Sequence, residues 1–230
     1  MRSWIKAAIA VLVLAGLLVG ADRIAVVVAQ GQAADKLAGR QGITGKPSVS
    51  IGDFPFLTDL ISRKVDSVHL SGAGVQLSGA GRDFQLENFS ADLKGVQVSG
   101  DYRSATVDSG TGTGRIGYQE VQTLLGLDAR TTLGYGGPGL VKVTGELLGQ
   151  KISTTVKLRT DGDTISVDSV GALPGIGSLP GVTQLINSQI GSRNFTLQGS
   201  MPVGLRLQQV TPQPDGLALV FQGSHLQLVG

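Results

Sequence analysis

The stretch VDSVHLSGAGVQLS, residues 65–78, predicts a long β-strand that changes direction near its middle. Apolar side chains alternate on both sides of the central SGAG, at even positions before it and odd positions after it: Val68, Leu70, Val75 and Leu77. A side-chain period of two cannot change face unless a residue is added or the strand bends. We therefore expect a bulge or a bend at Gly72 and Gly74.

The end of the chain repeats this pattern in GLALVFQGSHLQLVG, residues 216–230. The apolar positions are odd before Gly223 and even after it: Leu217, Leu219, Phe221, Leu226 and Leu228. Shorter alternating segments occur at 89–98, 141–143, 152–158, 165–167 and 203–207. Long strands that kink at glycine belong to strongly curved sheets, so we expect a long, curved antiparallel meander with one apolar face.

Three segments have the spacing of amphipathic helices: residues 24–40, 117–126 and 178–191. The first is expected to turn one face inward, made of Ile24, Val27, Val28, Gly31, Ala34 (or Asp35), Leu37 and Ala38. The other two are short and end at glycine. The predicted fold class is α+β, with one N-terminal helix and two short helices accompanying the sheet.

The N-terminus indicates export. MRSWIK is a short basic segment, and residues 7–21 form an uncharged apolar run that ends in small residues. This run is shorter than the ~20 residues of a typical membrane span, which favours a cleaved signal peptide, and an uncleaved anchor is the alternative. We expect residues 1–21 to be the signal peptide or anchor and residues 22–230 to be a single exported domain, in the periplasm or cell envelope.

Charge argues against nucleic acid as a partner. The whole chain has 19 Lys and Arg and 17 Asp and Glu, but residues 1–21 contain two of the basic residues and no acid. The domain that remains is formally neutral and has no basic stripe with interleaved aromatic residues.

The sequence contains no recognisable catalytic centre. It has no cysteine, no Gly-x-Ser-x-Gly motif, and only two histidines, His69 and His225, without a second ligand at metal spacing. GTGRIG, residues 112–117, has the spacing of a dinucleotide-binding loop, but antiparallel strands are expected around it instead of a parallel βαβ unit. We therefore expect no enzymatic activity, no metal and no cofactor.

The stretch KPSVSIGDFPFLTDLI, residues 46–61, concentrates apolar side chains beside a proline. One interpretation is that Phe54 and Phe56 close one end of the core while Pro55 sets a turn. The other is that the same apolar group forms the wall or mouth of a cavity. Both can hold, because a cavity wall is also core.

Residues 46–77, together with MPVGLRLQQVTPQPDGLALVFQGSHLQL (201–228), resemble the LmeA-type phospholipid-binding family of actinobacterial cell envelopes. The family's Pro-x-Val-x-Ile-x-Gly-Phe-Pro-Phe-Leu-like stretch is matched by Pro47, Val49, Ile51, Phe54, Pro55, Phe56 and Leu57. Asp53 departs from it by separating Gly52 from Phe54. The motifs consist of packing and turn residues and include no catalytic ones.

The resemblance implies a tubular lipid-binding architecture, in which the curved sheet wraps a long helix and leaves an apolar cavity, and a role in envelope lipid or lipoglycan maintenance. The expected ligand is a phospholipid or another acyl lipid, and a membrane surface is an expected partner. The candidate lipid-binding residues are Phe54, Phe56, Leu57, Leu60, Ile61, Val182, Leu185 and Ile186. Two alternatives stay open: an exported structural β-domain that binds a protein through a sheet edge, and a hydrolase or glycan-acting enzyme.

Overall fold

The computed structural model describes residues 2–38, 46–79, 82–100, 104–147, 150–162, 164–170, 195–196 and 203–229. Its helices are α1 (Arg2–Ala38), α2 (Phe56–Ser62) and α3 (Tyr118–Leu125). Its strands are β1 (Ser48–Ile51), β2 (Lys64–Gly79), β3 (Arg82–Val98), β4 (Ser104–Ile116), β5 (Thr132–Gly137), β6 (Leu140–Leu147), β7 (Gln150–Asp161), β8 (Thr164–Val170), β9 (Phe195–Thr196), β10 (Val203–Gln213) and β11 (Gly216–Val229).

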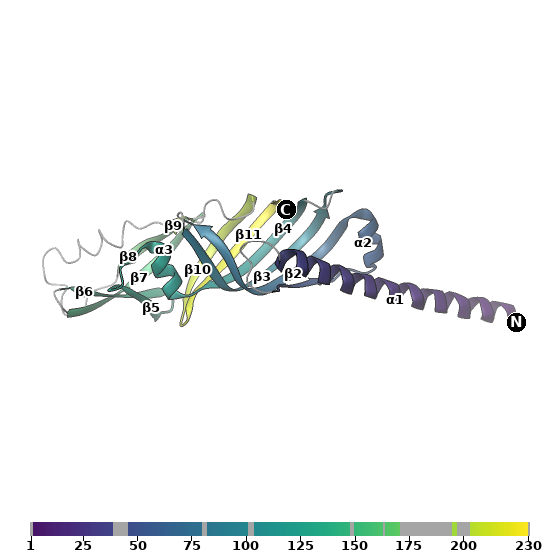
Figure 1. The fold of residues 1–230 in the computed structure, drawn as a ribbon, viewed down its shortest axis with the longest axis horizontal. Helices are drawn as coiled ribbons and strands as arrows, with labels where there is room; N and C mark the ends of the chain where they lie inside the picture. Colours follow the sequence, from purple (N-terminus) through teal and green to yellow (C-terminus); the bar gives the residue numbers. More distant parts are fainter. Residues whose placement is uncertain are drawn as a thin grey trace.

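The described strands form two antiparallel sheets. The larger has the order β1-β2-β3-β4-β11-β10, and the smaller has the order β5-β6-β7-β8-β9. The molecule is elongated, with α1 projecting from one end and the smaller sheet with α3 at the other (Figure 1). The long strands expected from residues 65–78 and 216–230 are therefore confirmed as β2 and β11.

Strand β2 bends where its sequence predicts a change of face. Its register with β3 continues without a shift from Lys64 to Gly79, so no residue is added. Gly74 has a φ of 72°, in the left-handed region that glycine enters without steric cost. The change of face is thus a bend and not a bulge.

A second line of bends crosses the sheet through β3 and β11, and the sequence did not predict its position in β3. Gly95 in β3 has a φ of 63° and His225 in β11 a φ of 51°. On either side of Gly95, Leu93 and Val96 pack into the same apolar cluster although they are three residues apart. Side chains three apart point to opposite faces of a regular strand, so β3 changes face at Gly95.

In β11 the expected change of face falls next to Gly223. The register with β10 shifts between Val203 and Leu205, and Gly204 has a φ of 95°. Leu217, Leu219 and Phe221 accordingly belong to one apolar cluster and Leu226 to another.

The main core lies between the two sheets. Its buried residues come from β3, β4, β6, β7, β10, β11 and α3: Leu86, Ile116, Leu124, Val141, Val143, Val156, Leu207, Leu217, Leu219 and Phe221. Strand β10 contacts both β5 and β7, which joins the larger sheet to the smaller one.

Helix α1 is longer than the predicted helix and turns a different face inward. It runs without a break from Arg2 to Ala38, whereas the spacing predicted a start at Ile24. Ile24, Val27 and Val28, which were expected to face the sheet, are exposed, so the prediction is wrong for these three residues, whereas Ala34 is buried as predicted.

The face that does pack follows a spacing of four, with Asp22, Val26 and Ala34 buried. Gln30, on the same face, donates from Nε2 to the Ile51 carbonyl at 3.4 Å. The helix is apolar on nearly all sides, so the spacing of hydrophobic residues could not identify the face that packs. The hydrogen-bonding residues on that face, such as Gln30, determine it.

The α+β class with an N-terminal helix and a long antiparallel sheet is confirmed. Helix α1 lies against β1 and α2, at the edge of the larger sheet, and is not enclosed by the sheet's curve. Of the two predicted short helices, residues 117–126 form α3, and residues 178–191 lie outside the described part of the chain. Helix α2, within the Phe-Pro-Phe stretch, was not predicted as a helix.

Candidate lipid-binding cavity

An apolar cavity lies where α3 covers the junction of the two sheets. It is lined by Ile116, Tyr118, Val121, Leu124, Leu125, Leu127, Leu133, Val141, Val143, Val156, Leu158, Ile165, Ser166, Val167, Leu217 and Leu219. The free interior measures about 70 Å³, or about 840 Å³ when the gaps between side chains and the solvent at its edge are counted. The cavity is therefore a narrow apolar crevice.

Strand alternation explains why this crevice is apolar. Val141 and Val143 in β6 and Val156 and Leu158 in β7 are each two residues apart, so they point to the same side of the smaller sheet. The residues between them, such as Lys142 and Lys157, are exposed. The sheet thus presents aliphatic side chains to the cavity and charged ones to solvent.

The first turn of helix α3 is held by neighbouring segments. Tyr118 donates its hydroxyl to the Gln213 carbonyl at 2.8 Å, and Glu120 accepts the Gln85 amide at 3.1 Å. Gly126 ends the helix with a φ of 61° and donates to the Thr123 carbonyl. Burial raises the pKa of Tyr118, and Tyr135 and Asp215 add to this effect, so the phenol stays protonated and able to donate.

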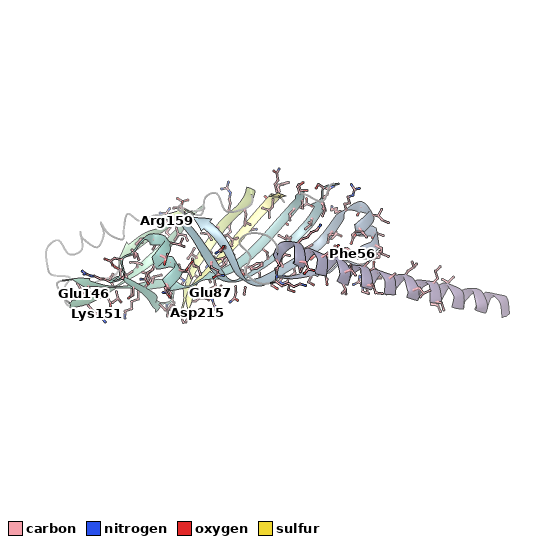
Figure 2. The ribbon with its side chains drawn as sticks, viewed as in Figure 1. Phe56, Glu87, Glu146, Lys151, Arg159 and Asp215 are labelled. Carbon is pink, nitrogen blue, oxygen red and sulfur yellow. The ribbon has the colours of Figure 1, made fainter. Side chains whose placement is uncertain are left out.

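Charged side chains gather at the β4–β11 end of the cavity, but they satisfy one another. Arg115 donates from Nε to Glu87 at 2.9 Å and from a terminal nitrogen to Asp215. Figure 2 shows Glu87 and Asp215 near the middle of the molecule, well away from Phe56 at the α1 end. Among the described residues, no group of three or more His, Asp or Glu side chains could hold a metal ion.

A second apolar cluster extends from the cavity toward α2. Val96, Val107 and Leu226 are buried in it. Leu205 packs against both this cluster and the main core. The apolar interior therefore continues along the larger sheet beyond the cavity.

None of the five described candidate residues lines this cavity. Phe56 is 3% exposed and packs in α2, and Leu57 is half-buried. Phe54, Leu60 and Ile61 are 62%, 50% and 85% exposed. The other three candidates, Val182, Leu185 and Ile186, lie outside the described residues.

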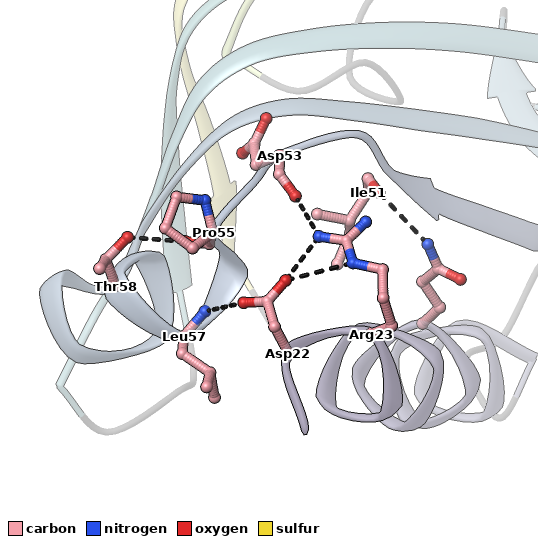
Figure 3. Close-up of polar contacts among 8 residues, drawn as sticks. Asp22, Arg23, Ile51, Asp53, Pro55, Leu57 and Thr58 are labelled. Atoms are coloured by element: carbon pink, nitrogen blue, oxygen red, sulfur yellow. Dashed lines mark hydrogen bonds and ion pairs between the residues drawn. The ribbon is translucent and has the colours of Figure 1, made fainter. Parts of the chain in front are cut away.

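The Phe-Pro-Phe stretch instead holds α1 in place, as Figure 3 shows. The buried Asp22 carboxylate accepts the Leu57 amide at 2.8 Å and the Arg23 guanidinium at 2.6 Å. Arg23 also donates to the Asp53 carbonyl at 3.0 Å, and its guanidinium lies 5.1 Å from the centre of the Phe54 ring. This network ties α2 to one point of α1.

The GTGRIG glycines have a packing role. Gly112 and Gly114 lie inside β4, which is antiparallel to both neighbouring strands, so the dinucleotide-loop context is absent. A Cβ at Gly114 would lie 2.9 Å from Leu86 Cδ1, closer than real Cβ contacts, and a Cβ at Gly110 would crowd Leu226 equally. The glycine spacing follows the strand period, and Gly110 and Gly114 make room for leucines from the neighbouring strands, whereas a Cβ at Gly112 would meet only ordinary contacts.

The two histidines lie on exposed strand surfaces. His69 Nδ1 is 2.7 Å from Asp92 Oδ1, on the neighbouring strand β3, and both side chains are well exposed. Ser50 faces His69 across β1 and β2, but none of these three residues lines the cavity.

A model of the LmeA-like phospholipid-binding family matches residues 20–222 of the 230. The chain belongs to this family. The resemblance carried by the Phe-Pro-Phe stretch is thereby confirmed, and the family is defined by lipid binding and not by a reaction. No curated protein and no solved structure matches the chain. The matched region of this LmeA-like protein begins just before Asp22 and includes α2, α3 and every residue that lines the cavity.

Sequence reasoning missed the cavity itself. Its lining comes mainly from β4, β5, β6, β7, β8, β11 and α3, which are spread over about a hundred residues and meet only in the fold. The alternation at 141–143, 156–158 and 165–167 was a usable signal, because it named the inward residues of the smaller sheet. The alternation did not indicate which other elements these inward residues face.

Proposed function

We propose that this LmeA-like protein binds phospholipid by its acyl chains in the α3 cavity and so supports lipid maintenance in the cell envelope, without catalysing a reaction. The observation that carries the proposal is the lining: apart from Ser166 and the Tyr118 hydroxyl, every side chain named around the cavity is a hydrocarbon. Such a wall suits an acyl chain and offers nothing to a polar substrate.

Binding requires the crevice to widen. The free interior of about 70 Å³ is well below the ~300–1,000 Å³ of typical ligand pockets. Helix α3 is the element suited to move, because it is only eight residues long and is bounded by Gly117 and Gly126. We expect the lipid-bound form to have α3 displaced outward from β6 and β7.

The remaining candidate residues enter the proposal as contacts from segment 178–191. Val182, Leu185 and Ile186 share the apolar face of a helix-like pattern. We assign them to the bound lipid because they follow β8 in the chain, and β8 supplies Ile165 and Val167 to the cavity.

The test fills the cavity. Val121 is half-buried on α3 and lines it, whereas Gln119 is exposed on the same helix. Val121→Trp should lower co-purifying phospholipid several-fold in native mass spectrometry and lipid extraction, while circular dichroism keeps its strand signal. Gln119→Trp is the matched control and should leave lipid content unchanged. A parent protein that never carries phospholipid, or a folded Val121→Trp protein with full lipid content, would overturn the proposal.

One observation favours the protein-binding alternative. Strand β1 pairs with only Val68 to Ser71 of β2, and the described part of the chain places no other strand beside Gly72–Gly79. An unpaired strand edge of this length can accept a strand from a partner. Crosslinking from this edge to one defined protein, in a chain that holds no lipid, would support this second function.

The location follows from α1. The helix contains one stretch, Val11–Lys36, that is long and apolar enough to cross a membrane by length and composition. We place the strand-rich body in the periplasm or envelope, because the basic Arg2 and Lys6 precede the apolar run and basic residues stay on the cytoplasmic side.

A further inference from the structure

We propose that Phe54, Leu60 and Ile61 form a membrane-docking patch that inserts into the interfacial layer of the bilayer in which α1 is anchored. The proposal takes α1 as an uncleaved anchor and rests on the export orientation proposed above, and it concerns a surface separate from the cavity. In this proposal the three exposed candidate residues contact the lipids of the bilayer, whereas the sequence suggested that they contact a lipid held in the cavity.

The first step is exposure. Within eight residues, Phe54, Leu60 and Ile61 leave half or more of their side-chain surface open, while Phe56 between them is buried. Single exposed apolar residues are ordinary, but three large ones gathered on one turn and one short helix mark a contact surface. Phe56 anchors α2 to the body, so the patch is held outward by the fold.

The second step is position along α1. Residues 4–21, in which Trp4 and Ile5 lengthen the apolar run and Lys6 can reach the cytoplasmic surface, would span ~27 Å as a helix, close to the ~30 Å hydrocarbon thickness of a bilayer. Asp22, the next residue, is where α2 attaches through the Leu57 amide. If the part of α1 that crosses the membrane ends at Ala21, before the charged Asp22 and Arg23, α2 therefore lies at the membrane surface.

The third step is rigidity. Asp22 holds the Leu57 amide, and Arg23 holds both the Asp53 carbonyl and the Phe54 ring. These contacts fix the depth and direction of the patch relative to α1. Aromatic and aliphatic side chains held at this level are typical of interfacial anchors.

Charge modulates the docking but does not drive it. Arg23 is about half exposed, and Arg63 and Lys64 follow α2 as exposed cations that suit anionic headgroups. Asp53, Asp59 and Asp66 lie in the same region. Asp53 accepts the Ser67 amide at 3.3 Å, and burial and the charges of Asp53 and Asp66 raise the pKa of Asp59. With both signs present, the apolar side chains supply the attraction.

The experiment uses the full chain, which has no cysteine of its own. Ile61→Cys and Lys151→Cys are each labelled with an environment-sensitive fluorophore and reconstituted into phosphatidylcholine–phosphatidylglycerol vesicles. Lys151 is exposed on β7, far from α1 in Figure 2. We expect a blue-shifted emission at position 61 and quenching by lipids spin-labelled near the headgroup, and neither effect at position 151.

A second variant tests the patch as a unit. Leu60→Glu should return the label at position 61 to its aqueous emission while the protein stays membrane-integral, because α1 is unchanged. Equal, solvent-like emission at positions 61 and 151 would overturn the proposal, as would insertion that Leu60→Glu does not affect. Phospholipid content, measured on the same samples, reports on the cavity separately, so failure of docking and failure of lipid binding are distinguishable.

Discussion

Leu226 fills a hole in the larger sheet that three glycines create. Its Cδ1 lies 2.9 Å from where a Cβ at Gly110 would be, and its Cδ2 occupies the corresponding space at Gly204 and Gly223. Leu226 is among the most completely buried side chains described. Leu226 and the glycines around it therefore pack together. Two substitutions test this packing, one that shortens Leu226 and one that enlarges a glycine.

The magnitudes follow from volume. Leu226→Ala removes a buried side chain and should lower the free energy of unfolding by about 2–5 kcal/mol. Gly110→Ala adds a Cβ that crowds Leu226 Cδ1 and Leu93 Cδ2, and should cost about 1–3 kcal/mol. In the double variant the added methyl group occupies space that the leucine has left. The combined loss should fall short of the sum by about 1 kcal/mol or more.

The assay is urea unfolding of the full chain in detergent, followed by far-ultraviolet circular dichroism. The change in midpoint at constant slope gives each difference in unfolding free energy. Gly145→Ala is the matched control, since a Cβ at Gly145 meets no atom within 4 Å. Two results would refute the proposed packing of Leu226 against the glycines. One is strict additivity of the two losses in unfolding free energy, and the other is a loss below about 1 kcal/mol for Leu226→Ala.

Three further outcomes are expected. Replacing His69 and His225 together by Gln should change the unfolding free energy by no more than about 0.5 kcal/mol and leave phospholipid content unchanged, because both side chains are exposed; a folded variant that loses function would point to an enzyme. The raised pKa of Asp59 means that the folded chain takes up a proton before the unfolded chain. Relative to Asp59→Asn, the parent should therefore gain stability as pH falls through that raised pKa and gain no more below about 3.8, as thermal melts at several pH values would show; a pH-independent difference would contradict the assignment. A chain starting at Asp22 should be extractable from membranes by carbonate, whereas the full chain should not; equal retention of both would show that α1 is not the main membrane element.

The strands were predictable because the alternation of apolar and polar residues lies within each segment itself. Alternation in 65–78 and 216–230 predicted β2 and β11. The exchange of odd and even apolar positions within each segment located the bends where Gly74 and His225 have positive φ. The bend at Gly95 was harder to see. Val96 and Val98 resume the alternation after it, but only the packing of Leu93 and Val96 into one cluster shows that the face has changed.

The face of α1 was not predictable from hydrophobicity. Ile24, Val27 and Val28 are as apolar as Val26, so the periodic pattern had no contrast to detect. The face is chosen by polar groups: Asp22 reaches the Leu57 amide and Gln30 the Ile51 carbonyl. Those acceptors and donors belong to segments that become neighbours of α1 only after folding.

The question raised by Phe54 and Phe56 is resolved by their different directions. Phe56 turns inward and fixes α2, and Phe54 turns outward under Arg23. The stretch therefore couples α1 to the sheet, whereas the cavity lies around α3 at the other end of the molecule (Figure 1).

This separation bears on how lipid could reach the cavity. If the bilayer lies at the α2 end, as proposed above, an acyl chain has to travel the length of the larger sheet before it meets α3. The cluster of Val96, Val107 and Leu226 lies along that way, and Leu205 joins it to the main core. A polar barrier there would make transfer costly, because each buried methylene contributes ~0.8 kcal/mol that is lost in water. Leu205→Asp should accordingly slow lipid exchange with vesicles more than it lowers the amount of lipid held at equilibrium, and an equal loss of both would place the entry at the α3 end instead.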